Sequence, residues 1–258
     1  MLSLVIFGTF FALALAGVPL MVSLLATTVG VVVGYGMQYP LESVFLSFIG
    51  GVEPFILIAV PLFVFTGELL AQGGVGKRIV AFANVLFGWL PGGLGVVTVM
   101  SCLLFGGVSG SAIADTAAIG SLVIPAMLAK GYSRGFAAAL VAVAGTLALL
   151  MPLSIPFLVY AFISGVSMRT LSMAGLLPAI ISAIALVAVC MWHGRKTGVD
   201  PGGTPASLGA IAQAAYSAGP ALLMPIFIVG GIWSGYFTPT EAAAVAVVYG
   251  LVISMFFY

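Results

Sequence analysis

The segment Phe105–Ala126, FGGVSGSAIADTAAIGSLVIPA, gathers polar atoms in an otherwise apolar part of the chain. Ser109, Gly110 and Ser111 form a run of small residues, and Asp115 follows about one helical turn later. Hydroxyl and backbone carbonyl oxygens are the hard ligands that a small hard cation prefers. A carboxylate at this spacing either holds the loop by accepting its N–H groups or balances the charge of a bound cation. We expect the first, structural, role for Asp115.

A second interruption lies at residues 145–156, GTLALLMPLSIP, inside an apolar stretch (136–168) that is too long for a plain membrane span. Pro152 and Pro156 each remove a backbone donor and crowd the preceding helical turn. The pattern predicts two half-helices separated by an unwound segment around 149–154. A helix that is only kinked at the prolines is the alternative. Unwound carbonyls bind small cations, and half-helix N-termini bind anionic groups, so the two interruptions together predict a binding site.

The composition places these segments in a membrane. Of the 258 residues, 63% are hydrophobic and only 5% are charged, whereas a soluble domain carries about a quarter charged residues. The apolar runs are long and lack the alternation of barrel strands, so the sequence predicts an all-α integral membrane protein. A formal net charge of +1 argues against a nucleic-acid partner. Cys102 and Cys190 lie in apolar runs, where we expect neither a disulfide nor a metal site.

The lengths of the apolar runs divide the chain into spans and shorter pieces. About 20 helical residues cross the hydrocarbon core, and four stretches have about that length: 54–72, 172–192, 218–236 and 239–258. The stretch 76–89 opens with two cations, ends in Trp89 and is too short to cross, which predicts a helix along the interface. The end of a span is the alternative. Residues 1–37 hold either one long tilted span or two short ones hinged at 17–19. Thr238 and Glu241 have the capping-box spacing that starts a helix.

The polar run at 109–111 joins two apolar arms. The first arm, 92–105, has 14 residues and reaches only about 21 Å as a helix, which is too short to cross. The second arm, 112–129, returns toward a basic residue. We therefore expect a re-entrant helical hairpin whose tip is surrounded by protein or by a water-filled cavity. Six of the seven cations then share one face, as the positive-inside rule requires: Lys77, Arg78, Lys130, Arg134, Arg195 and Lys196.

Four segments, in order along the chain, resemble the large membrane subunit of tripartite ATP-independent periplasmic (TRAP) transporters, the DctM-like family. They are VPLFVFTGELLAQGG (60–74), FGGVSGSAIADTAAIGSLVIPAMLAKGY (105–132), PLSIPFLVYAFISGVS (152–167) and GGIWSGYFTPTEAAAVAVVYGL (230–251). The resemblance implies an elevator-type secondary transporter of the bacterial inner membrane that takes up organic acids, such as C4-dicarboxylates or sialic acid, driven by Na⁺. It also implies two partners, a small (Q-type) membrane subunit and a soluble periplasmic substrate-binding protein.

The resemblance assigns roles to individual residues. The family's first sodium site lies between the hairpin tip and the broken helix, which here means the Ser109 side chain or carbonyl and the carbonyls of Ala148, Met151 and Leu153. The substrate region is expected beside it, near Gly110, Ser111 and Thr146, with Asp115 and Pro152 as structural support. The chain departs from the family pattern at 144–154, where one glycine and two prolines that favour unwinding are absent. Carbonyl ligands do not depend on side-chain identity, so this departure bears on the unwinding rather than on the ligands.

The resemblance also divides the chain into three parts. Residues 1–91 correspond to scaffold spans and an interfacial arm, 92–168 to the transport unit, and 169–258 to further spans that begin a second repeat. The family's large subunit has two inverted repeats, each with a hairpin and a broken helix, and this chain holds one of each. We expect the second half of the site on the remaining half of the large subunit, outside this chain. A scaffold or assembly subunit that does not transport is the alternative. A membrane-embedded enzyme is disfavoured, because the one deep carboxylate has no histidine near it.

The distribution of cations generates a topology prediction. In a background with Cys102 and Cys190 replaced by alanine, we expect single cysteines at positions 77 and 130 to react with an impermeant thiol reagent from the cytoplasmic side. A cysteine at position 169 should react from the periplasmic side, because one full crossing separates it from position 130. Intact cells and inverted vesicles that carry the complete transporter expose the two sides. Labelling of positions 77 and 130 from opposite faces would show that the first arm crosses the membrane.

Overall fold

The computed structural model describes residues 2–36, 40–51 and 54–257, and all regular elements within these residues are helical. The chain divides into two compact units, residues 1–54 and 55–258. Six segments of the described chain are long and apolar enough to cross a membrane: Phe55–Gln72, Ala112–Ala129, Arg134–Ser164, Met168–Thr197, Leu208–Ser234 and Pro239–Phe257. The four predicted spans each lie largely within one of these segments, and the all-α membrane fold class is confirmed.

The first unit contains α1 (Leu2–Leu15), α2 (Leu20–Gly34) and α3 (Leu41–Gly50). Between α1 and α2 the chain turns at Gly17, whose φ of 85° lies in the left-handed region that glycine adopts without steric cost. Pro19 then stands directly before α2, where its missing N–H disturbs no helical hydrogen bond. Within the described residues 2–36, the N-terminal stretch therefore forms two short helices rather than one long one.

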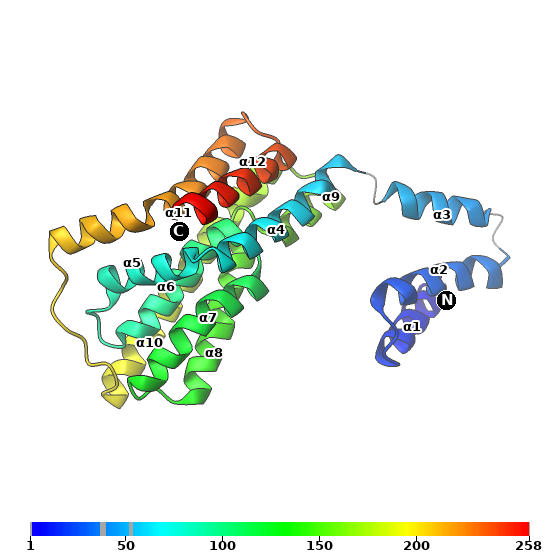
Figure 1. Ribbon diagram of the computed structural model, residues 1–258. Helices are drawn as coiled ribbons and strands as arrows, with labels where there is room; N and C mark the ends of the chain where they lie inside the picture. The colour runs from blue at the N-terminus through cyan, green and yellow to red at the C-terminus, as the bar shows by residue number, and fades with distance from the viewer. Residues whose placement is uncertain (1, 37–39, 52–53, 258) are drawn as a thin grey trace. The chain divides into compact units, whose positions relative to one another are not determined.

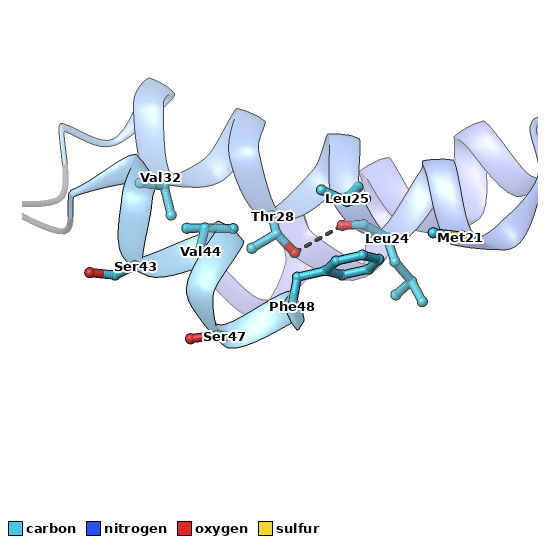
Figure 2. A pocket seen from close by; sticks show the side chains of 9 residues that line it. All are labelled: Met21, Leu24, Leu25, Thr28, Val32, Ser43, Val44, Ser47 and Phe48. Carbon is cyan, nitrogen blue, oxygen red and sulfur yellow. Dashed lines mark hydrogen bonds between the residues drawn. The ribbon is translucent and has the colours of Figure 1, made fainter. Parts of the chain in front are cut away.

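Helices α2 and α3 enclose an apolar groove of about 450 Å³, shown in Figure 2. Its lining residues are Met21, Leu24, Leu25, Thr28, Val32, Ser43, Val44, Ser47 and Phe48. The Thr28 hydroxyl donates to the Leu24 carbonyl of its own helix at 2.8 Å (Figure 2). The groove is therefore suited to lipid or to another apolar surface rather than to a polar ligand.

The second unit is built around a pair of helices, α6 (Gly93–Ser109) and α7 (Ala112–Ala129). All of α6 except Met100, Leu103 and Leu104 is buried, because α5 (Val75–Phe87), α8 (Arg134–Gly145) and α10 (Met168–Thr197) pack around it (Figure 1). The outer ends of α6 and α7 meet at Asp200, which accepts the Leu94 N–H and the Lys130 ammonium, both at 2.8 Å. The two helices therefore form a hairpin. Its insertion from one face of a membrane stays a prediction.

The predicted break in the next helical segment is also present. Helix α8 runs into a 3₁₀ turn, η2 (Thr146–Leu150), and α9 (Ile155–Ser164) starts after an extended stretch. Met151 has ψ 154° and Ser154 has ψ 137°, values of extended backbone rather than of a kinked helix. The break therefore forms without the additional glycine and prolines of the family pattern, and the kinked-helix alternative is wrong.

The remaining helices support this centre. They are η1 (Phe55–Ile58), α4 (Ala59–Gln72), α11 (Leu208–Ser234), α12 (Pro239–Val252) and the π-helical turn η3 (Ile253–Phe257). Helix α4 packs against α12, and α11 packs against α5. The capping box at the start of α12 is confirmed, because the Thr238 N–H donates to Glu241 Oε2 at 2.8 Å while the Glu241 N–H donates to Thr238 Oγ1 at 3.3 Å. The placement of α5 along a membrane interface stays a prediction, as does the functional division at residues 91/92 and 168/169.

Candidate functional site: the hairpin tip and the broken helix

The tip of the hairpin is a tight turn made by Gly110. Helix α6 ends at Ser109, and Gly110 follows with φ +59°, donating its N–H to the Gly106 carbonyl at 3.1 Å. A Cβ on Gly110 would collide with the Leu153 carbonyl oxygen. Ser111 then caps α7 by accepting the Ala114 N–H at 3.4 Å. Glycine is thus required at position 110 both for its backbone conformation and for its contact with the broken helix.

The broken helix meets the tip through its own interruption. The Met151 N–H donates to the Ala148 carbonyl at 3.3 Å, and the Ser154 N–H donates to the Met151 carbonyl at 3.0 Å. Ser154 caps α9 by accepting the Phe157 N–H at 3.3 Å, and the Ile155 N–H donates to the Gly110 carbonyl at 3.4 Å. The first turn of α9 is therefore hydrogen-bonded directly to the hairpin tip.

Ser109 and Asp115 form a fully buried polar pair beneath the tip, each with 0% exposure. The Ser109 hydroxyl donates to Asp115 Oδ1 and accepts the Ser111 N–H at 3.2 Å. Asp115 therefore reaches the tip through this hydroxyl and not, as we expected, by accepting N–H groups of the tip itself. The carboxylate is acceptor-only when ionised, so the hydroxyl proton must point toward it.

The other carboxylate oxygen, Asp115 Oδ2, is buried and has no hydrogen-bond partner among the described residues. A Cβ built on Gly106 would lie 2.8 Å from this oxygen and 2.7 Å from the Ala148 Cα. The oxygen is therefore aimed at the crossing of α6 and η2, which comes this close only because residue 106 has no side chain. A buried polar atom without a partner costs free energy, on the order of 1–3 kcal/mol and more for a charged group.

The structure brings most of the predicted sodium-site residues together. Ser109 and Ala148 are fully buried, Leu153 is 1% exposed, and Met151 is partly buried. The Leu153 carbonyl lies against Gly110, and Ala148 lies against Gly106. Hydroxyl, carbonyl and carboxylate oxygens are a donor set that fits a small hard cation such as Na⁺, although the Ala148 and Met151 carbonyls already accept the Met151 and Ser154 N–H groups.

The predicted substrate residues divide into two groups. Gly110 is buried and Ser111 partly buried at the tip. Thr146 is exposed, and its hydroxyl donates to the Val143 carbonyl at the end of α8 at 2.7 Å, so its side chain lies outside the cluster. Thr116, one residue after Asp115, instead lies against this part of the broken helix, because a Cβ on Gly145 would collide with its Oγ1.

Sequence reasoning missed the residue that anchors the extended stretch. Ser172 of α10 is 1% exposed and donates its hydroxyl to the Pro152 carbonyl at 2.9 Å. Pro152, predicted as structural support, is thereby held by α10. A lone serine in a long apolar run carries no local signal of this role, because its partner is 20 residues away.

Comparison with known proteins decides the family. The family "Tripartite ATP-independent periplasmic transporter, DctM component" matches residues 7–258. This chain belongs to the DctM family. It is 38% identical to the C4-dicarboxylate TRAP transporter large permease protein DctM of Rhodobacter capsulatus, over 100% of this chain and 61% of the relative. It is 36% identical to the isethionate TRAP transporter permease protein DctMQ of Oleidesulfovibrio alaskensis, over 98% of this chain and 40% of the relative.

A third relative widens the range of solutes within the DctM family. The ectoine TRAP transporter large permease protein TeaC of Halomonas elongata is 36% identical over 95% of this chain and 58% of its own length. The chain therefore spans about half the length of the curated relatives that it matches. The family consists of transporter permeases and not of enzymes.

The tip geometry predicts a steric penalty at Gly110 that a matched glycine does not share. We expect Gly110→Ala to lower the midpoint of thermal unfolding by several degrees more than Gly131→Ala does. Both glycines have positive φ, 59° and 92°, but a Cβ on Gly131 meets nothing within 4 Å. Both variants therefore bear the left-handed backbone cost of roughly 1–2 kcal/mol, and only Gly110→Ala adds overpacking of about 1–3 kcal/mol. Equal midpoints for the two purified proteins would show that the tip does not press on the broken helix.

Proposed function

We propose that this chain is the permease component of a sodium-coupled uptake system for organic acids. The observation that carries the proposal is the buried Ser109–Asp115 pair, with its unpaired carboxylate oxygen, at the junction of the tip and the broken helix. Ionisable groups inside a membrane protein are costly and mark ion or substrate pathways. The relatives are named for a dicarboxylate, for isethionate and for ectoine, and each of these small solutes carries a carboxylate or a sulfonate.

In this proposal the sodium ion is held by the Ser109 hydroxyl and the carbonyls of Ala148, Met151 and Leu153. Asp115 balances its charge, because the unpaired Oδ2 lies beside Ala148 at the crossing of α6 and η2. This favours the second of the two roles considered for Asp115 over the structural one. When bound, Na⁺ would couple uptake to the sodium gradient, and the residues of this chain orient the oxygen ligands and exclude water from them.

The substrate is proposed to bind beside the tip, near Gly110 and Ser111. The N-termini of α7 and α9 both lie at this junction, capped by Ser111 and Ser154. Helix N-termini stabilise anions through their unsatisfied N–H groups and the helix dipole. A carboxylate of the substrate is the complementary group, and the remaining half of the large subunit supplies the other half of the pocket.

Movement is proposed to follow the elevator scheme, in the bacterial inner membrane. The hairpin is re-entrant, its outer ends face the cytoplasm, and residues 92–168 carry the site across while residues 1–91 stay with the scaffold. The packing of α7, α8 and η2 against α6 supports this, since these elements all belong to residues 92–168. The partners are a Q-type small membrane subunit and a soluble periplasmic binding protein. The name of the isethionate relative, DctMQ, supports the first of them.

The proposal is tested by reconstitution of the complete transporter, with this chain, the remaining half of the large subunit, the Q-type subunit and the binding protein. We expect organic-acid uptake into proteoliposomes to require both an inward sodium gradient and the binding protein. A non-transporting scaffold subunit is the alternative function, because the chain spans only 40 to 61% of its relatives. Unchanged uptake after omission of this chain would establish that alternative.

The sodium site generates a prediction for Ser109. We expect Ser109→Ala to raise the sodium concentration for half-maximal uptake about tenfold, the scale of one lost contact to a charged group. The substitution removes a ligand and also the hydrogen bond to Asp115. Ser121→Ala is the matched control, because the Ser121 hydroxyl is exposed on α7 and donates to the Ala118 carbonyl of its own helix at 2.9 Å. An unchanged sodium dependence in Ser109→Ala would remove this side chain from the site.

Asp115→Asn separates the two roles of the carboxylate. Asparagine keeps the size and one acceptor oxygen, so it retains the hydrogen bond from Ser109 but loses the negative charge. We expect a loss of apparent sodium affinity at least as large as in Ser109→Ala, measured as sodium-dependent uptake at fixed amounts of protein. Wild-type sodium dependence in this variant would return Asp115 to a purely structural role.

A further inference from the structure

The open end of the hairpin is a junction of three loops that come from distant parts of the sequence. They precede α6, join α7 to α8, and follow α10. Asp200, in the third loop, contacts the other two: its Oδ2 accepts the Leu94 N–H and its Oδ1 accepts the Lys130 ammonium, both at 2.8 Å. Its backbone carbonyl accepts the Gly92 N–H at 2.8 Å, and the Gly203 N–H donates to the Trp89 carbonyl at 3.0 Å. In Figure 1 this loop is the yellow linker that leaves α10.

The Asp200 carboxylate is sheltered, although the linker around it is exposed. Its side chain is 7% exposed, against 48% for its partner Lys130. A negative charge at the start of α6 is favourable, because it faces the positive end of the helix dipole. Burial, and after it the Asp200 carboxylate, raises the pKa of Tyr132, so the Tyr132 hydroxyl stays protonated beside the junction. Asp200 also has φ 53°, a conformation that aspartate accepts at a small cost when its contacts hold it.

The end of α10 touches the base of the hairpin through glycines. A Cβ on Gly194 would collide with the Gly92 amide nitrogen, and a Cβ on Gly95 would lie 3.1 Å from both the Cβ and the Sγ of Cys190. The backbone of α10 is therefore in direct contact with the backbone at the base of the hairpin. Helix α10 cannot slide along α6 unless the two helices first separate. At the other side of the junction the linker is loosely held, since Thr204 and Pro205 are exposed before Ser207 caps α11.

We infer that Asp200 is a positioning residue that clips both legs of the hairpin to the end of α10, so that hairpin and α10 move as one body. The expected effect on the rate of transport rests on the proposed function. The attachment of the hairpin to α10 rests on the contacts of the junction alone. The exposed stretch after Gly203 is then the point at which this body is free to turn relative to α11. Loss of the clip slows the movement without altering the cation ligands at the far end of the hairpin.

The test replaces the clip by a covalent bond. In the complete transporter with Cys102→Ala, we expect Asp200→Ala to lower the maximal uptake rate about tenfold, the scale of one hydrogen bond to a charged group. The sodium concentration for half-maximal uptake should stay unchanged.

Gly95→Cys, added to this variant, stands against the native Cys190 at a Cβ separation of 3.1 Å. A small opening brings this separation into the roughly 3.5–4.5 Å range of a disulfide. Oxidation with copper phenanthroline should restore the rate, and reduction should abolish the recovery.

Two matched variants define the controls. Arg195→Met removes an exposed cation near the same end of α10 and should leave uptake unchanged. A second disulfide, between cysteines at positions 76 and 118, joins α5 to α7, where a Cβ on Gly76 would lie 3.9 Å from the Ala118 Cβ. This bond links the proposed scaffold to the moving unit, so its oxidation should block uptake. Block of uptake by the 95–190 disulfide in the otherwise wild-type chain would overturn the inference, as would failure of the formed disulfide to rescue Asp200→Ala.

A measurement without transport separates this inference from the proposed function. The Leu94 amide donates to the Asp200 carboxylate at 2.8 Å, so Asp200→Ala should speed its hydrogen exchange at least tenfold while the Gly110 amide at the tip stays protected. Wild-type exchange at the Leu94 amide would overturn the clip whatever the transporter does. Faster exchange in a complete transporter that shows no sodium-dependent uptake would leave the clip in place and reject the proposed function.

Discussion

Backbone N–H and C=O groups have no water to bond in the hydrocarbon layer, so each interruption of a membrane helix must find partners inside the protein. Two interruptions satisfy one another in this chain. The Gly110 carbonyl, at the end of α6, accepts the Ile155 N–H at the start of α9, and the Leu153 carbonyl lies against Gly110. The tip and the break therefore depend on each other, because each supplies hydrogen-bond or packing partners for the interrupted backbone of the other.

The packing around this pair follows from the same constraint. Apolar burial gives little force between helices in lipid, and close van der Waals contact takes its place. Gly106 lets α6 approach η2 until Ala148 and the Asp115 carboxylate occupy the space that a Cβ would need. The Ser172 hydroxyl of α10 then donates a hydrogen bond to the Pro152 carbonyl. Glycine and serine, which weaken an isolated helix, here allow the contacts that hold the centre of the unit together.

The unpaired oxygen of Asp115 links this packing to the proposed function. One carboxylate oxygen of Asp115 accepts the Ser109 hydroxyl, and this hydrogen bond is enough to hold the tip. The second oxygen has no partner among the described residues. A group that costs stability in the absence of a ligand can contribute to affinity when a cation arrives, because the desolvation has already taken place. The glycine-rich crossing of α6 and η2 thus serves as both packing device and candidate ion site.

Local patterns in the sequence determined the helical membrane fold, the tip at 109–111, the break near Pro152 and the capping box at Thr238. Each of these rests on neighbours within about one helical turn or on the length of an apolar run. The partner of Asp115, the outward direction of Thr146, the anchor Ser172 and the clip at Asp200 were decided by the tertiary structure. Asp200 and Leu94 are 106 residues apart, and no periodicity in a single sequence records a contact at such a separation. Helix geometry can be read from composition and spacing, whereas the pairing of buried polar groups depends on which backbones approach closely enough to share them.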